Sequence, residues 1–222
     1  RTHPPGLALH ELPSIHYVLL SHDHYDHCDL PSLRLIARAH DPVAFTPLGN
    51  GELLKYAGFS RVIELDWWQA CQRTPNLRIT ATPAQHWSSR LGQQRSSRLW
   101  SGFFLHAGQH RIYFAGDTGY APGLFTGLAQ RLGQPDLALL PIGAYEPRWF
   151  MSGQHCDPAE ALKIHRDLGA RTSVAMHWGT FRLADEGRDD PPQALQAALA
   201  ASDLNNKDFR VLAPGGHIVF PN

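Results

Sequence analysis

A six-residue segment constrains the fold of this chain more than any other, because it contains four candidate metal ligands: His22, His24, Asp26 and His27. It directly follows the largely apolar run Ile15–Leu20. If a strand extends from Val18 to His22, residues two apart point to one face, so His22 and His24 can bind one cation together. Asp26 and His27 then lie past the turn that follows this strand, within reach of a second cation. Imidazole mixed with carboxylate favours zinc, or iron or manganese, over calcium.

Three further candidate ligands follow segments that predict strands. They are His86 after Leu77–Thr82, Asp117 after Arg111–Ala115, and His177 after Thr172–Met176. The chain has 14 histidines in 222 residues, so a lone histidine means little, and an Asp in a Gly-rich turn is usually a turn former. Active sites gather where strands end in loops over a rigid sheet. The set of four strand ends therefore predicts one dinuclear metal site.

Five motifs lie between Ser21 and Phe181, and four of them contain the candidate ligands: Ser21–His27, Thr82–Trp87, Phe114–Tyr120 and His177–Phe181. The fifth motif is Leu140–Trp149. Together they resemble the metallo-β-lactamase-fold hydrolases and, more closely, the N-acylphosphatidylethanolamine-hydrolysing phospholipase D group and its bacterial relatives. The resemblance implies an α+β fold, a four-layer αββα sandwich.

The resemblance also implies a role for each residue of the site. One zinc ion is expected on His22, His24 and His86, a second on Asp26, His27 and His177, and Asp117 bridges the two. Asp26 and Asp117 are the expected catalytic carboxylates. Tyr25 and His155, the latter in the stretch Gln154–Pro158, are expected to contact the substrate. The alternatives are packing beside the metal loop for Tyr25, and a capping or turn role before the following helix for His155.

Two cations roughly 3.5 to 4 Å apart can hold a bridging water and lower its pKa toward about 7, so that hydroxide attacks phosphorus or a carbonyl carbon. No Gly-x-Ser-x-Gly elbow suggests a serine hydrolase instead. The motifs favour a phosphodiesterase that converts N-acylphosphatidylethanolamine-like phospholipids to N-acylethanolamine and phosphatidic acid. A lactonase acting on a phosphorylated sugar lactone is the alternative enzyme. A non-catalytic lipid- or partner-binding module is the alternative from another class.

Composition limits the partners of this enzyme. Lys plus Arg equals Asp plus Glu, 20 against 20, so the chain has no overall charge that attracts nucleic acid. Three cysteines without a Cys-x-x-Cys pair indicate a reducing compartment, and we expect the cytoplasm. The expected partner is a phospholipid or a small phosphorylated substrate. Peripheral contact with a membrane and a homo-oligomer both stay open.

Helices are predicted over Leu30–His40, Asp157–Leu168 and Pro191–Ser202, with Gly58 and Gly169 as stops. Leu99–His106 and Arg111–Ala115 predict a hairpin, and His217–Phe220 a last strand. Two long loops are expected, Trp87–Arg98 and Asp185–Pro192. The first loop contains three arginines, which suit phosphate oxygens but are more often simply solvated: Arg90, Arg95 and Arg98.

The length suggests one domain spanning residues 1–222. Only 21 residues precede the first metal motif, and the chain begins with Arg. Members of the resembled family place several strands before this motif. We therefore expect the N-terminal strands of the sandwich to be missing from this chain, and the sequence does not indicate where a targeting signal lies.

Overall fold

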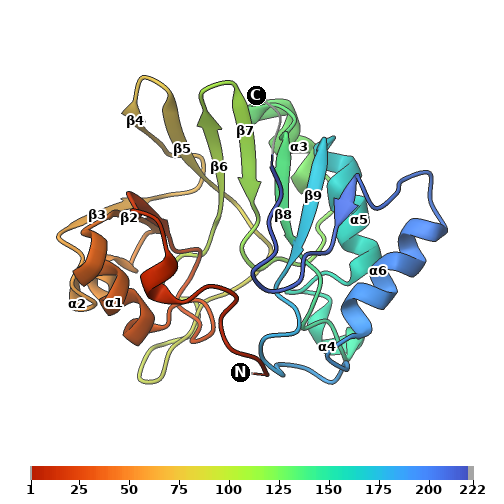
Figure 1. Ribbon diagram of the computed structural model, residues 1–222, viewed down its shortest axis with the longest axis horizontal. Helices are drawn as coiled ribbons and strands as arrows, with labels where there is room; N and C mark the ends of the chain where they lie inside the picture. The colour runs from red at the N-terminus through yellow and green to blue at the C-terminus, as the bar shows by residue number, and fades with distance from the viewer. Residues whose placement is uncertain (1, 220–222) are drawn as a thin grey trace.

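The computed structural model describes residues 2–219, which form two β-sheets that face each other (Figure 1). The smaller sheet is parallel, in the order β1-β2-β3, with β1 (Tyr17–Leu19), β2 (Val43–Pro47) and β3 (Arg61–Leu65). The larger sheet has the order β10-β9-β8-β7-β6-β5-β4. Its strands are β4 (Ala70–Thr74), β5 (Leu77–Thr82), β6 (Gly102–Ala107), β7 (His110–Phe114), β8 (Leu137–Pro141), β9 (Thr172–Met176) and β10 (Phe209–Arg210).

Helices cover the outer face of each sheet (Figure 1). The smaller sheet is flanked by α1 (Leu30–His40) and α2 (Gly51–Tyr56). The larger sheet is flanked by α3 (Leu124–Leu132), α5 (Pro158–Leu168) and α6 (Asp190–Ala200), while the short α4 (Arg148–Met151) lies at the lower edge of the view. A 3₁₀ turn, η1 (Leu9–Glu11), precedes β1.

Three apolar clusters separate these layers. One lies between the larger sheet and its helices, around Phe104, Phe125 and Ile164, and one between the smaller sheet and its helices, around Leu33 and Leu54. The third joins the two sheets and includes Phe45, Ile79 and Phe103, which are fully buried. Three apolar layers between four structural layers are what an αββα sandwich requires, so the predicted fold class is confirmed.

Capping residues fix both ends of two predicted helices, α1 and α5. The Asp29 carboxylate accepts the Ser32 N–H at 3.0 Å, and Asp41 at φ 43° ends α1. Asp157 and Glu160 form a reciprocal capping box at the start of α5, and Gly169 at φ 58° ends it.

Three element boundaries differ from the prediction. The strand expected over Val18–His22 ends at Leu19, because β2 pairs with it only as far as Phe45. The first hairpin strand begins at Gly102, since Leu99 and Ser101 instead donate their N–H groups to Leu48 and Ser21 outside the sheet. The second long loop stops where α6 begins, because the Pro pair of the predicted helix occupies its first turn.

The last predicted strand, His217–Phe220, does not form over residues 217–219, and Phe220 lies outside the described residues. The final strand is β10, which pairs in parallel with β9. Cys28, Cys71 and Cys156 are free thiols. Within residues 2–219, no helix is both long and apolar enough to cross a membrane.

Candidate metal centre

The strand directions bring three of the candidate ligand segments to one edge of the larger sheet. Strands β5 and β7 are both antiparallel to β6, so they run in the same direction, and β8 and β9 run parallel to β7. His86, Asp117 and His177 follow β5, β7 and β9 in the chain. They therefore meet at the edge formed by the carboxyl ends of those strands.

The first metal motif reaches this edge from the smaller sheet. Ser21 O accepts the Ser101 N–H at 2.9 Å, which ties the segment after β1 to the segment before β6. Gly116 has φ 62°, and a Cβ there would lie 2.8 Å from the Ser21 Cβ. Glycine is thus needed for the chain to pass Ser21 and place Asp117 beside His22.

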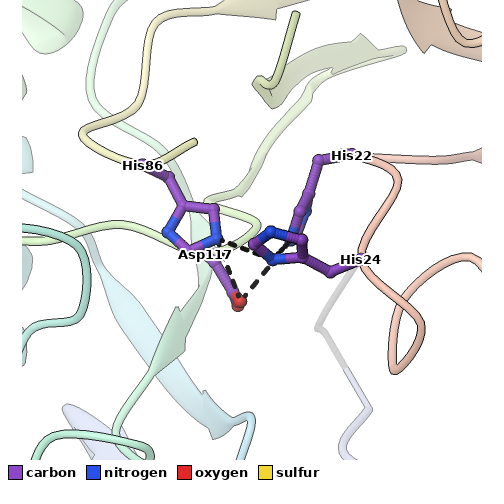
Figure 2. Close-up of side chains that lie close together, drawn as sticks. All are labelled: His22, His24, His86 and Asp117. Carbon is purple, nitrogen blue, oxygen red and sulfur yellow. Dashed lines mark hydrogen bonds and ion pairs between the residues drawn. The ribbon is translucent and has the colours of Figure 1, made fainter. Parts of the chain in front are cut away.

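The first group of candidate ligands contains His22, His24, His86 and Asp117 (Figure 2). The His24 Nδ1 atom lies 3.0 Å from His22 Nε2 and 3.3 Å from His86 Nε2. The Asp117 Oδ2 atom lies 3.7 Å from His22 Nε2 and 3.6 Å from His86 Nε2. Ligand atoms about 2.0–2.1 Å from a tetrahedral zinc ion lie roughly 3.3 Å from one another, so these spacings fit such an ion.

The second group contains Asp26, His27, His177 and again Asp117. The Asp26 Oδ2 atom is 3.2 Å from Nε2 of both His27 and His177. Asp117 approaches His27 Nε2 with Oδ2 at 3.0 Å and His177 Nε2 with Oδ1 at 3.3 Å. Asp117 therefore belongs to both groups, and its buried Oδ1 makes no hydrogen bond to any described residue, which leaves it available to a cation.

The three histidines of the first group favour the neutral form. Burial lowers the pKa of His86 to about 4 and also lowers the pKa values of His22 and His24. A neutral imidazole has a lone pair to offer, whereas an imidazolium does not. Three such lone pairs facing one another at hydrogen-bond distance are stabilised by a shared cation.

The second group attracts positive charge. Burial would lower the pKa of His27, but the Asp117 and Asp26 carboxylates beside it raise that pKa to about 10. Burial would also lower the pKa of His177, but the same two carboxylates raise it above its usual value. Burial would raise the pKa of Asp117, but the His177 and His27 imidazoles hold it well below its usual range. A metal ion at this position would replace the protons on the two rings.

Outer contacts orient two of the rings. With Nε2 turned toward the other ligands, His22 donates its Nδ1–H to Ser21 Oγ at 3.0 Å, and His86 donates its Nδ1–H to Gln154 O at 2.9 Å. Such contacts set the tautomer of a metal-binding histidine. Ser21 opens the first motif and Gln154 opens the stretch that contains His155, but sequence reasoning gave neither residue a role in orienting a ring.

Asp23, which sequence reasoning also left without a role, anchors the metal motif to the loop after His86. Its buried carboxylate accepts the Ser89 N–H at 2.8 Å and an Arg98 Nη1–H at 3.1 Å. Arg90 donates from Nη1 to the backbone oxygens of Asp23 at 2.7 Å and Cys28 at 2.9 Å. Two of the three arginines predicted to face phosphate or solvent are therefore bound to protein groups.

The two predicted substrate contacts differ in burial and in partners. The His155 ring is buried, stands edge-on to His86 at 5.0 Å between ring centroids, and stacks on His177 at 5.5 Å. Its Nδ1 atom has no hydrogen-bond partner among the described residues. The Tyr25 ring is largely exposed, and its hydroxyl accepts the Leu91 N–H at 3.1 Å.

A cavity of about 410 Å³ opens beside His177, between the loop after β8 and the segment that follows β9. The Glu186 carboxylate joins these walls, since it accepts the Ala144 N–H at 2.6 Å and the Glu146 N–H at 3.0 Å. Phe181, Leu183 and Arg182 also line the cavity, which is thus partly apolar and partly charged. Glu186 stands outside the five motifs, and sequence reasoning gave it no role.

Comparison with known proteins places these features in context. A family model, the beta-lactamase superfamily domain, matches residues 1–178. N-acyl-phosphatidylethanolamine-hydrolyzing phospholipase D 1 of Caenorhabditis elegans is 36% identical over 220 residues, which cover 94% of this chain and 62% of that protein. The mitochondrial N-acyl-phosphatidylethanolamine-hydrolyzing phospholipase D of Saccharomyces cerevisiae is 40% identical over 191 residues, which cover 84% of this chain and 41% of that protein.

The chain thus spans less than two thirds of the length of these two relatives. Among solved structures, a metallo hydrolase from the archaeon Ignicoccus hospitalis superposes with a TM-score of 0.72 at 24% identity, and the match covers 97% of this chain and 84% of the other. At that identity the likeness establishes the shared fold.

Proposed function

The chain belongs to the beta-lactamase superfamily domain family, and from this membership and the geometry of the site we propose a dinuclear zinc-dependent phosphodiesterase of phospholipase D type. Its relatives include the two phospholipases D and a further metal-dependent hydrolase, which confirms the predicted class of enzyme. The proposed reaction converts an N-acylphosphatidylethanolamine-like phospholipid to N-acylethanolamine and phosphatidic acid.

The observation that carries the proposal is the pair of ligand groups that share Asp117. One zinc ion would lie among His22, His24 and His86, and the other among Asp26, His27 and His177. When bound there, two cations would supply Lewis acidity toward a phosphoryl oxygen and a water molecule whose pKa falls toward about 7. Iron or manganese in place of zinc fits the same donor atoms.

The two carboxylates have separate roles in this proposal. Asp117 is buried, and its Oδ2 atom lies within 3.7 Å of nitrogen atoms in both groups, so it fixes the spacing between them. Asp26 is more exposed, with Oδ2 3.2 Å from both His27 and His177. From there it can accept the proton that the attacking water releases.

His155 and Tyr25 are the proposed substrate contacts. The unpartnered Nδ1 atom of His155 lies in a ring packed against His86 and His177, so it is available to a substrate oxygen held at the metals. The Tyr25 hydroxyl accepts one hydrogen bond from Leu91 and keeps its own proton to donate.

Two exposed aromatic side chains support peripheral contact with a phospholipid surface. In α4, next to the cavity wall, Trp149 is 84% exposed and Phe150 is 60% exposed. Large apolar side chains exposed side by side suit an interface with lipid. A homo-oligomer and a cytoplasmic location stay predictions from the sequence.

Metal content and turnover test the proposal together. We expect about two zinc ions per chain by elemental analysis, and release of N-acylethanolamine from the phospholipid by mass spectrometry. Asp117→Asn should lower turnover by more than about 100-fold, because contacts outside the metal ligands alone cost 10–100-fold. Asp41→Asn, an exposed carboxylate distant from the site, is the matched control and should leave turnover unchanged. Full turnover by the Asp117→Asn variant would refute the bridging role.

The cavity beside His177 favours one alternative. A lactonase acting on a phosphorylated sugar lactone needs a small pocket with polar groups, and Arg182, Arg188 and Asp185 line this one beside the apolar Phe181 and Leu183. Both substrates should therefore be offered to the same zinc-loaded protein. Hydrolysis of the lactone without hydrolysis of the phospholipid would decide for the lactonase.

A further inference from the structure

The three arginines of the Trp87–Arg98 loop are in different environments. Arg98 binds Asp23 through Nη1 at 3.1 Å and Gly49 O through Nε at 2.9 Å. Arg90 binds two backbone oxygens and lies over the Tyr25 ring, 4.1 Å from its centroid. Part of each of these two guanidinium groups is therefore held by protein groups, Arg98 through Nε and Nη1 and Arg90 through Nη1.

Arg95 differs, because its exposed guanidinium makes no hydrogen bond or ion pair with the residues that the structure describes. Its carbon Cζ lies 4.1 Å from the centroid of the Trp87 ring. That ring in turn stands edge-on to the His24 ring, with 4.6 Å between centroids. A guanidinium stacked on an aromatic face keeps the N–H groups at its edge available, and they match the oxygen atoms of a phosphate.

The loop is built to hold Arg95 in this position. Ser96 donates its N–H to Ser88 O at 2.7 Å, which closes the loop behind Arg95. Ser88 and Ser89 are themselves bound to Arg98 O and to the Asp23 carboxylate. The side chain of Arg95 is thus partly ordered before any ligand arrives, which reduces the entropy lost on binding.

We infer that Arg95 binds a phosphate oxygen of the substrate beside the His24 side of the metal centre and so selects for anionic substrates. The inference rests on the proposed function. It names a chemistry that both candidate substrates share, since a phosphodiester phospholipid and a phosphorylated lactone each carry an anionic phosphate.

Binding of dimethyl phosphate to the zinc-loaded protein, measured by titration calorimetry, tests this inference without turnover. Arg95→Met should weaken the affinity for this anion by about 10- to 150-fold, the loss expected for a hydrogen bond to a charged group. Neutral trimethyl phosphate should bind both proteins equally. The matched control is Arg34→Met, because Arg34 is also exposed and also stacks on an aromatic ring, that of Tyr56 at 4.7 Å, but lies on α1.

Arg95→Lys keeps the charge without the planar fork, so an intermediate affinity supports a role in phosphate binding rather than in folding. Equal affinities of the wild-type and Arg95→Met proteins for dimethyl phosphate overturn the inference, as does a wild-type protein that does not bind this anion. Anion binding that depends on Arg95, in a protein that cleaves no phospholipid, would leave the inference standing and remove the proposed function.

Discussion

Replacing Asp23 by Asn tests whether the Trp87–Arg98 loop holds the first metal motif in place. The Asp23 side chain is 1% exposed and that of Arg98 is 11% exposed, with 3.1 Å between Oδ2 and Nη1. Asn has nearly the same size and keeps an oxygen acceptor for the Ser89 N–H. The substitution therefore removes chiefly the negative charge that balances Arg98.

The expected cost follows from this burial. Removing one partner of a buried ion pair costs about 3 to 5 kcal/mol of unfolding free energy. Arg98 also binds Gly49 O and keeps slight contact with solvent, so we expect the lower end, about 3 kcal/mol. For a chain of this length each kcal/mol corresponds to roughly 2 to 4 °C in melting temperature, so Asp23→Asn should lower it by roughly 6 to 12 °C.

Urea denaturation of a double-mutant cycle isolates the pair. Asp23→Asn, Arg98→Met and the double variant, measured in excess chelator so that metal binding does not contribute, should give a coupling energy above about 1 kcal/mol. The control cycle uses Asp41 and Arg61, whose side chains are 63% and 57% exposed and whose charged atoms are 3.5 Å apart. Its coupling should be below about 1 kcal/mol. Equal coupling in the two cycles would show that Asp23 does not anchor the motif.

Three further predictions concern metal, pH and lipid. Chelation should lower the melting temperature of the zinc-loaded protein by roughly 5 °C or more, and zinc should restore it in calorimetry; an unchanged transition would contradict a bound metal. Burial lowers the pKa of His165 in the folded protein. As pH drops below about 6.5, the unfolded chain therefore binds a proton at His165 that the folded chain does not bind, and the free energy of unfolding falls. Between pH 7.5 and 5.5, the melting temperature of His165→Gln should therefore fall less than that of the wild-type protein. An equal fall in both proteins would contradict this role of His165. Replacing Trp149 and Phe150 by Ser should weaken vesicle sedimentation by roughly tenfold or more while sparing hydrolysis of a soluble phosphodiester; unchanged sedimentation would exclude this lipid contact.

Helix boundaries could be predicted where the capping residue is local. Asp29 and Asp157 cap α1 and α5 through backbone groups three residues away, so the sequence next to each helix contains the whole interaction. Strand boundaries were less predictable, because a strand ends where its partner ends. The segment after Val18 is as apolar as a strand requires, yet it leaves the sheet after Leu19, where pairing with β2 stops.

The residues of the candidate site could be named from the sequence, but their supports could not. His22, His24, Asp26 and His27 share one short segment, so their spacing alone indicated a metal. Asp23 looked like one more acidic residue of that segment, because its partners Ser89 and Arg98 are more than 60 residues away. Glu186, which joins two walls of the cavity, was missed because its partners Ala144 and Glu146 are also distant in the chain, 42 and 40 residues away.

The sequence by itself determined the donor atoms: which imidazoles and carboxylates the chain offers, and that each of the four segments that contain them follows a strand. Only the tertiary structure decided that β5, β7 and β9 run in one direction, so that Asp117 reaches both groups of ligands. It also decided that, of the three arginines in the Trp87–Arg98 loop, Arg95 is the one whose N–H groups all stay unbound by the described residues. The chemistry of a side chain belongs to the residue itself, whereas the satisfaction of its hydrogen bonds depends on residues distant in the chain.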